Sequence, residues 1–380
     1  MENRKPTLRE IISSLVFIVF IGTFFILNFV IPEPAVLISE RRVPAKFPKL
    51  PKLTVESIQD GSFFKPILDG SFMSKFDDYA ADRFVFRDTF RGMHAFMVFD
   101  LYRQTDKSGL YRDRDVGVGE FKKTNETSFR QTTEKILKAA ESLTGYDMNI
   151  YYSIIPDKST FAGRYMPGFD LGIAEAILFD VLGEYEYIRI ADILSADAFY
   201  KTDLHWNQSK IMDVANHLLE GMGANTIPGV YQGVVAGEFR GLYAGQLALP
   251  VDADLITYVD IPGLRVRYLS EVTLEFEDGP LYDMERLSGV DPYDFYLRGP
   301  QPLIVLENDN APDRELYYFR DSFGSSLSPL LANSYSRITI IDLRYIHISL
   351  LEMFIDFVPG SDVLFMYGSQ IFNNPSVLQT

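Results

Sequence analysis

The sequence lacks cysteine and is poor in histidine and tryptophan, with 0, 4 and 1 of these residues among 380. A chain without cysteine has no disulfide framework, which fits the cytosol or the surface of a bacterium that does not rely on disulfides. The absence also excludes cysteine-ligated zinc, iron–sulfur clusters and a cysteine nucleophile. Because the sequence contains neither a G-x-G-x-x-G loop nor a G-x-S-x-G elbow, it gives no support to a dinucleotide enzyme or an α/β-hydrolase.

Basic residues are also in the minority, with 36 Lys and Arg against 52 Asp and Glu and a formal net charge of -16. A protein that grips nucleic acid regardless of base sequence needs clustered Lys and Arg to neutralise phosphates, and no such cluster occurs. We therefore expect no nucleic-acid partner. The apolar content of 47% is enough for one large domain, or one domain with an appendage.

One long apolar run, IISSLVFIVFIGTFFILNFVIP, occupies residues 11–32 and carries no charge. At about 1.5 Å per residue, it is long enough to cross a hydrocarbon core of about 30 Å. The run continues through bulky residues to Pro32 without a small-residue cleavage site. We interpret it as an uncleaved transmembrane anchor, and a cleaved secretory signal peptide is the alternative.

Basic residues on both sides of the run bear on its orientation. They precede it at Arg4, Lys5 and Arg9, and they follow it at Arg41 and Arg42. The positive-inside rule favours a cytoplasmic tail over residues 1–10 and an extracellular position for the bulk of the chain. The expected localisation is therefore the cell membrane, with a single span.

Residues 33–104 form a second region between the anchor and the main domain. Its first part, to about residue 53, is rich in proline, which favours an extended stalk or wrapping strand over helix. Residues 56–104 then mix aromatic and charged side chains at roughly helical spacing. We expect one or two amphipathic helices there, packed on the main domain.

Residues 105–380 show alternating strand and helix patterns, which predict an α/β fold with a mostly parallel sheet. Helices are expected over 128–144, 174–182, 207–221, 324–333 and 347–357. Strands are expected over 148–156, 187–194, 316–319, 337–342 and 362–367. Residues 225–300 break this rhythm with glycines, prolines and short alternating apolar segments, and we interpret them as a β-rich insertion.

The first segment with chemical potential is D-x-H-W at residues 203–206, just before the predicted helix at 207–221. An aspartate two residues before a histidine can accept the Nδ1 proton, which leaves Nε2 free to act as a base. The alternative is that Asp203 is an ordinary loop residue and His205 a solvated or capping histidine. A metal site built on the two with another carboxylate is a further alternative, although no His-x-x-x-His pair accompanies them, and we expect no metal.

The second segment, D-S-F-G at residues 321–324, follows a predicted strand and precedes a predicted helix. Ser322 would project from the carboxyl end of a parallel strand, near backbone N–H groups that can stabilise an oxyanion. Taken alone, such a turn also fits a simple helix cap. Together the two segments supply the nucleophile, base and orienting carboxylate of a catalytic relay, each at a strand-end loop.

These residues carry a resemblance to the DHHW family of bacterial surface proteins. More broadly, the chain resembles the SGNH-hydrolase-like domains of the alginate O-acetylation proteins and related cell-wall polysaccharide O-acetyltransferases. The resemblance rests on D-x-H-W at 203–206, R-D-S-F-G at 320–324, and their order, which is reversed relative to ordinary SGNH hydrolases. Weaker similarity covers E-R-R at 40–42, D-G-S-F at 69–72 and I-P-D-K at 155–158.

The resemblance implies an SGNH-like, flavodoxin-like sheet with circularly permuted motifs. It implies Ser322 as nucleophile, His205 as general base and Asp203 as its orienter, with an acyl group, most simply acetyl, passed to a carbohydrate hydroxyl or to water. Leu204 stands where the family name implies a second histidine. The glycine and asparagine of the usual oxyanion hole have no clear counterpart, and Gly368 and Asn373 are the candidates in the corresponding region.

Four further residues near these blocks are candidates for substrate binding. Arg320 would pair with a charge of the substrate or donor, or else anchor a local carboxylate. Trp206 would stack on a sugar ring, or else pack in the core. Lys158 and Tyr200 would border the cleft, although a solvated surface role is the alternative for the lysine.

We therefore expect a membrane-anchored, extracytoplasmic O-acyltransferase or esterase that acts on a cell-surface polysaccharide without a cofactor. A transferase would take its acyl groups from a membrane-bound O-acyltransferase partner. The rival hypothesis is a non-catalytic protein that binds polysaccharide or supports assembly through the same cleft, since a fold does not decide a function. The relay makes one geometric prediction: His205 and Ser322 lie within hydrogen-bond reach.

Overall fold

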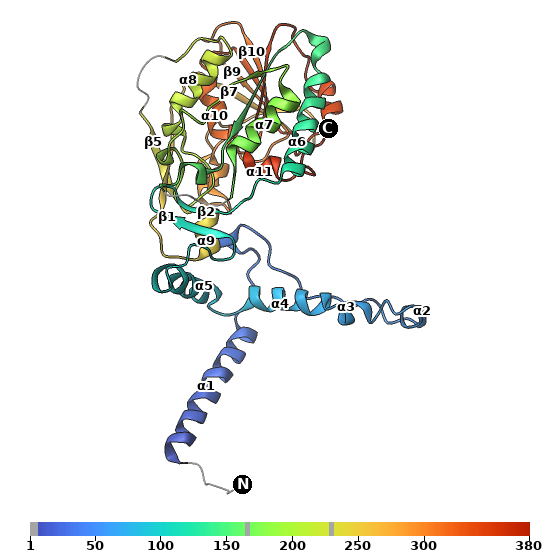
Figure 1. Cartoon of the computed structure of the whole chain (residues 1–380), viewed down its shortest axis with the longest axis vertical. Coiled ribbons are helices and arrows are strands. Elements are labelled where there is room, and N and C mark those ends of the chain that lie inside the picture. The colour runs from blue at the N-terminus through green and yellow to red at the C-terminus, as the bar shows by residue number, and fades with distance from the viewer. Residues whose placement is uncertain (1–6, 164–167, 228–231) are drawn as a thin grey trace. The chain divides into compact units, whose positions relative to one another are not determined.

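The computed structural model describes residues 7–163, 168–227 and 232–380. Two compact units make up the chain (Figure 1): Met1–Leu101 with Gln246–Pro250, and Tyr102–Gly245 with Val251–Thr380. The first unit holds the N-terminal apolar helix, and the second holds the large sheet.

The apolar helix of the first unit, α1, runs over Leu8–Val30. Thr7 starts it with a capping box, in which its hydroxyl accepts the Glu10 N–H and the Glu10 carboxylate accepts the Thr7 N–H. The stretch Leu8–Asn28 has a mean hydropathy of 2.4, and its most apolar window is 0% buried. An apolar helix long enough to cross a membrane is thus present where we expect it, and both an anchor and a signal sequence fit this description.

The remainder of the first unit contains more helices than the one or two we predict. They are a 3₁₀ turn (Ile38–Glu40), α2 (Val55–Gln59), α3 (Lys65–Leu68), α4 (Ser71–Arg83), α5 (Arg87–Phe96) and a π-helical segment (Met97–Leu101). Residues 43–54 adopt neither helix nor strand, as their prolines suggest. Just before this segment, Arg42 donates from both Nη atoms to the two carboxylate oxygens of Asp82, each at 2.6 Å.

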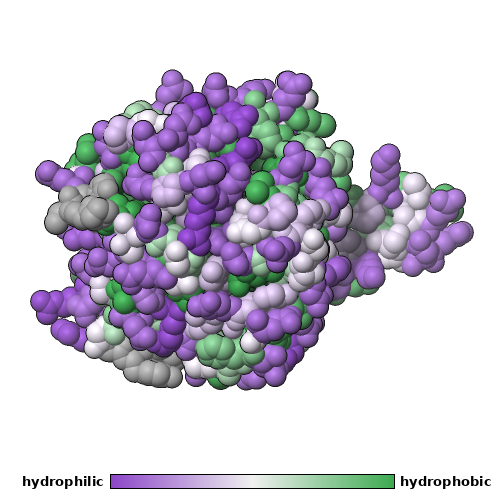
Figure 2. All heavy atoms as spheres, turned by 90° about the horizontal axis from the view of Figure 1, so that it is seen from above, coloured by the Kyte–Doolittle hydropathy of each residue, from purple (hydrophilic) through white to green (hydrophobic). Residues whose placement is uncertain are grey.

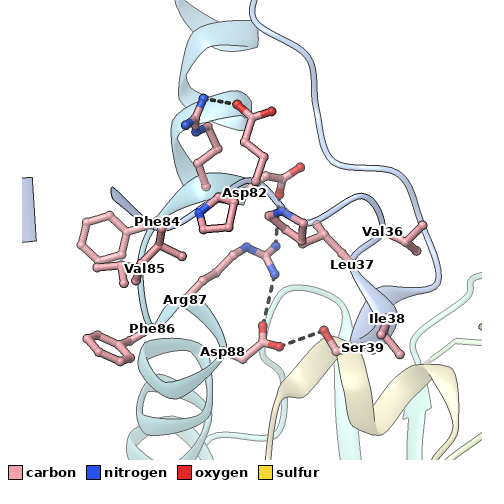
Figure 3. A pocket seen from close by; sticks show the side chains of 15 residues that line it. Val36, Leu37, Ile38, Ser39, Asp82, Phe84, Val85, Phe86, Arg87 and Asp88 are labelled. Carbon is pink, nitrogen blue, oxygen red and sulfur yellow. Dashed lines mark hydrogen bonds and ion pairs between the residues drawn. The ribbon is translucent and has the colours of Figure 1, made fainter. Parts of the chain in front are cut away.

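A cavity of about 420 Å³ lies in this unit between residues 31–39 and 82–88 (Figure 3). Figure 3 shows Arg87 beside Asp88, whose carboxylate accepts the Ser39 hydroxyl at 3.0 Å. Phe84 and Phe86 lie together on one side of it. The hydrogen bond from Ser39 thus ties the segment after α1 to the start of α5.

The second unit is built on an eight-stranded sheet with the order β4-β3-β12-β10-β11-β9-β7-β8. The five strands from β4 to β11 are parallel, and β9, β7 and β8 continue the sheet with antiparallel pairings. The strands of this sheet are β3 (Asn149–Ile155), β4 (Glu186–Tyr187), β7 (Arg265–Leu269), β8 (Phe276–Asp278), β9 (Leu303–Glu307), β10 (Glu315–Arg320), β11 (Arg337–Ile341) and β12 (Asp362–Gly368). Two small hairpins lie outside it: β1 (Leu110–Asp113) with β2 (Gly117–Glu120), and β5 (Val234–Phe239) with β6 (Asp254–Tyr258).

Helices cover both faces of the sheet, because its central strands are apolar on both sides. Along β10, Leu316 and Tyr318 enter one core cluster with residues of α8 and α10, while Tyr317 and Phe319 enter the other with residues of α6 and α7. The helices with residues in these clusters are α6 (Glu126–Glu141), α7 (Leu171–Leu182), α8 (Met212–Gly221), α10 (Gly324–Leu331) and α11 (Ser369–Phe372), and a further short helix is α9 (Leu242–Leu247). The expected α/β fold with a mostly parallel sheet and flanking helices is confirmed (Figure 1).

Two local expectations are wrong in part. The strand expected over 187–194 is only Glu186–Tyr187, because a turn at 190–194 leaves the sheet. The helix expected over 347–357 is a 3₁₀ helix over Ile348–Met353. Residues 225–300 contain β5, β6, β7 and β8, as a β-rich insertion should, and β7 and β8 extend the main sheet through β9.

The helix expected over 207–221 is also divided. Asn207 caps a 3₁₀ turn over Gln208–Lys210, and α8 begins two residues later. Gly223 follows with a positive φ of 64°, as a helix-ending glycine should. On the face shown in Figure 2, hydrophilic side chains predominate and apolar ones are scattered, which fits the large net charge.

Candidate active site

Ser322 lies in the turn between β10 and α10, at the carboxyl end of a central parallel strand. The buried Asp321 carboxylate holds this turn, since it accepts the Phe323 N–H at 3.0 Å and the Gly368 N–H at 2.7 Å. Burial raises the pKa of Asp321 above its ordinary value. A Cβ at Gly324 would lie 2.7 Å from Cβ and Cγ of Arg320, so this tight turn requires glycine.

The loop that carries Asp203 and His205 is fixed by bonds at both ends. The Tyr200 N–H donates to the His205 carbonyl at 3.0 Å, which closes the loop. The Asp254 carboxylate accepts the N–H groups of Lys201 and Thr202 at 3.0 and 2.8 Å. The position of the loop therefore depends on β6, whose first residue is Asp254, as well as on the sequence of the loop itself.

His205 forms a continuous relay between Asp203 and Ser322. Its Nδ1 lies 2.7 Å from Oδ1 of Asp203, and its Nε2 lies 2.8 Å from Oγ of Ser322. The carboxylate of Asp203 can only accept, so Nδ1 carries the proton and Nε2 accepts the hydroxyl proton of Ser322. The predicted approach of His205 and Ser322 is confirmed.

The carboxylate of Asp203 is fully buried and has further donors. Oδ1 also accepts the backbone N–H of His205 at 3.1 Å, and Oδ2 accepts the Leu242 N–H at 2.8 Å. These donors hold the plane of the carboxylate, which in turn orients the imidazole.

Aromatic rings enclose the imidazole. The Tyr293 ring stacks on His205 with centroids 3.8 Å apart and planes 8° apart, and the Phe323 ring lies at 5.0 Å. The hydroxyl of Tyr293 is 2.9 Å from Oγ of Ser326. His205 is only 5% exposed, whereas Ser322 is partly exposed, so a substrate would reach the serine and not the histidine ring.

Contrary to our expectation, Lys158 does not border a cleft. It is 3% exposed, and Nζ donates at 2.8 Å to each of three carbonyl oxygens, those of Val118, Tyr200 and Asp203. Burial lowers its pKa to about 8. Because all three donors are used within the protein, Lys158 supports the Asp203 loop and does not bind substrate.

Arg320 and Tyr200 are likewise buried away from substrate. Arg320 is 1% exposed, and its Nη1 lies 3.1 Å from the Asp321 carbonyl and 3.4 Å from the Asp342 carboxylate. Tyr200 is 2% exposed, with its hydroxyl 3.3 Å from that of Tyr296. The alternative for Arg320, an anchor for a local carboxylate, is the correct one.

Trp206 is also a core residue and not a platform for sugar rings. It is 0% exposed, and its indole N–H donates to the Phe323 carbonyl at 3.0 Å and to Oγ of Ser326 at 2.9 Å. It thus joins the histidine loop to the first turn of α10.

Both residues proposed for the oxyanion hole make other contacts in the structure. The N–H of Gly368 is donated to Asp321. The amide of Asn373 donates to the Lys123 carbonyl at 3.1 Å and accepts the Asn125 N–H at 2.9 Å, which places it at the start of α6. Tertiary contacts thus take up the Gly368 N–H and one donor of the Asn373 amide, and the oxyanion hole stays a prediction.

Several residues of the site escape prediction from the sequence. Tyr293 belongs to an aromatic run, residues 293–296, with nothing to set it apart from core tyrosines. Leu242 acts through its backbone, so its side chain gives no signal. Gln370, whose amide donates to the Tyr243 hydroxyl at 3.1 Å, enters the same neighbourhood from α11.

Comparisons with known proteins bear on the fold that carries this site. No protein-family model and no curated protein matches the sequence. The fold is similar to that of a DHHW family protein. That protein, from Eubacterium siraeum, superposes with a TM-score of 0.59 at 18% identity, covering 72% of this chain and 97% of its own.

PatB1 from Bacillus cereus, in a structure with a sulfonyl adduct, has a TM-score of 0.56 at 17% identity, covering 71% of this chain and 98% of its own. The O-acetyltransferase domain of Pseudomonas putida AlgJ has a TM-score of 0.42 at 13% identity, covering 70% of this chain and 92% of its own. The similarity to the DHHW protein and PatB1 confirms the fold that the resemblance implies.

Proposed function

We propose that this chain is a membrane-anchored, extracytoplasmic enzyme that transfers or removes acyl groups, acetyl above all, on a cell-surface polysaccharide. The observation that carries the proposal is the relay from Asp203 through His205 to Ser322, with links of 2.7 and 2.8 Å. A helix cap needs no histidine at its hydroxyl, and a solvated histidine would not be 5% exposed beneath a stacked tyrosine. The relay therefore favours catalysis over binding alone.

The chemistry proceeds in two half-reactions. Oγ of Ser322 attacks the carbonyl carbon of an acyl ester or thioester while its proton passes to Nε2 of His205. The bond to the leaving group then breaks, the leaving atom takes that proton, and the acyl group remains on Ser322. Asp203 stabilises the imidazolium that forms between these steps.

The second half-reaction decides between transferase and esterase. A carbohydrate hydroxyl or water gives its proton to His205 and attacks the acyl-serine, which releases the product and restores the Ser322 hydroxyl. A transferase of this kind requires an acyl donor on its own side of the membrane, for which we propose a membrane-bound O-acyltransferase partner. The apolar helix α1 would keep the enzyme within reach of that partner and of polymers near the membrane.

A sulfonyl fluoride probe tests the proposal, since it forms a stable adduct only with an activated hydroxyl. We expect the probe to label the full-length protein, and we expect Ser322→Ala to abolish both labelling and the hydrolysis of 4-nitrophenyl acetate. Ser325→Ala is the matched control, because this serine lies three residues further on but is buried within α10. Full activity in the folded Ser322→Ala variant would refute the catalytic role and favour a binding protein.

A further inference from the structure

Helix α5 and the π-helical segment after it have two different apolar faces. One face is buried and contains Gly92, Ala95, Val98 and Phe99. A Cβ at Gly92 would lie 2.4 Å from the carbonyl oxygen of Ala248, so the backbone of α5 is in close contact there. This face accounts for the packing of the helix and leaves the other face without a role.

The second face is an exposed apolar stripe, formed by Phe86, Phe90, Met93 and Met97. These residues recur at i, i+4, i+7 and i+11, which is the spacing of one helix face. Phe90 and Met93 belong to α5, Phe86 is its N-cap, and Met97 opens the π-helical segment. They are 56%, 40%, 56% and 39% exposed. Leu101, at the end of the π-helical segment, extends the stripe and is 62% exposed. An apolar stripe of this length in contact with water is unfavourable, and such surfaces commonly mark an interaction site.

The stripe begins beside the apolar helix α1. Phe24 of α1, inside the candidate span Leu8–Asn28, lies 5.9 Å from the ring of Phe90 and 6.3 Å from that of Phe86. The Val85 N–H donates to Oδ1 of Asn28 at 3.0 Å, which fastens the start of α5 to the last turns of α1. The first rings of the stripe are therefore at the level of residues that would be surrounded by lipid.

The arginine side chains of α5 do not belong to the stripe and bind other groups of the first unit. Arg87 and Arg91 both bind the Glu40 carboxylate, each at 2.5 Å, and Arg91 also donates to the Gln246 carbonyl. The helix thus places its ion pairs in the first unit and its phenylalanines and methionines outside. This separation is typical of amphipathic helices that lie in the membrane interface.

We infer that α5 and the π-helical segment form an interfacial helix, whose stripe enters the boundary between headgroups and acyl chains where α1 leaves the bilayer. The inference rests on the anchoring role of α1 in the proposed function. Lipid is the occupant that the structure favours, because the stripe is continuous with the surface of α1 through Phe24. Two points of attachment, α1 and α5, would then fix the tilt of the first unit on the membrane.

The natural absence of cysteine permits a direct test. Full-length single-cysteine variants are labelled with a polarity-sensitive fluorophore and reconstituted into phosphatidylcholine–phosphatidylglycerol liposomes. Met93→Cys reports on the stripe, and His94→Cys is the matched control, since this exposed residue follows on the same helix but lies outside the stripe. Phe17→Cys, in the middle of α1, reports on the anchor. Quenching by acyl-chain nitroxide lipids is compared with quenching by aqueous iodide.

We expect the Met93 probe to lose its fluorescence to the nitroxide lipids and to resist iodide, and the His94 probe to be quenched chiefly by iodide. If both probes are equally open to iodide while the Phe17 probe is quenched by lipid, the interfacial helix is overturned and the anchor stands. If iodide also quenches the Phe17 probe, the anchor itself fails. If the Met93 probe is open to iodide in liposomes but protected in native membranes, a protein partner covers the stripe and the lipid assignment is wrong.

Discussion

Replacement of Asp203 by asparagine tests the relay most severely, because it changes one charge and almost no volume. The carboxylate serves three donors: Nδ1 and the backbone N–H of His205 at Oδ1, and the Leu242 N–H at Oδ2. An asparagine has only one acceptor oxygen to divide among them. Each orientation of the amide therefore leaves its NH₂ group facing a backbone N–H.

The two orientations weaken catalysis in different ways. With the amide oxygen toward Leu242, the NH₂ group faces Nδ1 of His205, so the imidazole must carry its proton on Nε2 and cannot accept one from Ser322. With the oxygen toward His205, the tautomer is kept but the imidazolium loses the neighbouring negative charge. The same substitution in a serine protease lowers kcat about 10⁴-fold, and we expect a loss of that order here. A buried donor without an acceptor should also cost about 1–3 kcal/mol of stability.

The assay is steady-state hydrolysis of 4-nitrophenyl acetate by the full-length protein, with the folded fraction measured by thermal unfolding. Asp362→Asn is the control, because this buried carboxylate accepts bonds from Arg314 at 2.7 Å and Tyr335 at 2.8 Å at the start of β12, the end of the strand away from Ser322. It should lose stability and keep its activity per folded molecule. If Asp203→Asn retains kcat within about tenfold of the wild type, the orienting role of the carboxylate is refuted.

Two further substitutions test the surroundings of the relay. Tyr293→Leu should lower kcat by about two- to tenfold, because a stacked aromatic pair contributes about 0.5–1.5 kcal/mol. Tyr293→Phe keeps the ring and should have a kcat near that of the wild type. Equal activity in the wild type and both variants would argue against a role for stacking on His205. The pKa of Lys158 is about 8 in the folded protein against 10.5 ordinarily, so the unfolded chain binds more protons between these pH values. From about pH 8 to about 10.5, the free energy of unfolding of the wild type should therefore rise relative to that of Lys158→Met. Urea unfolding at a series of pH values measures both free energies. A difference between them that does not change with pH would contradict this reasoning.

The main features of the fold follow from local patterns. The apolar run of α1, the two-sided apolar strands β10 and β12, and the helix that begins at Gly324 all depend on residues close together in the chain, which is why their patterns are readable. The relay was also predictable, since D-S-x-G at 321–324 directly follows the strand β10, and an aspartate two residues before a histidine can orient the imidazole at 203–205.

The roles of the polar residues around the relay depended instead on burial. Lys158, Arg320 and Trp206 look like surface or cleft residues in the sequence, yet they are 3%, 1% and 0% exposed. Their partners are carbonyls, a carboxylate and a hydroxyl, most of them brought near only by the folded chain.

By itself, the sequence determined which residue types form the relay and that Ser322 lies at the end of a strand. The tertiary structure alone decided that Tyr293 stacks on His205, that Leu242 supports Asp203, and that the N–H of Gly368 is already used. The reason is physical: a local pattern reports the conformation of neighbouring residues, whereas these contacts join segments up to about a hundred residues apart, and only packing determines which groups meet.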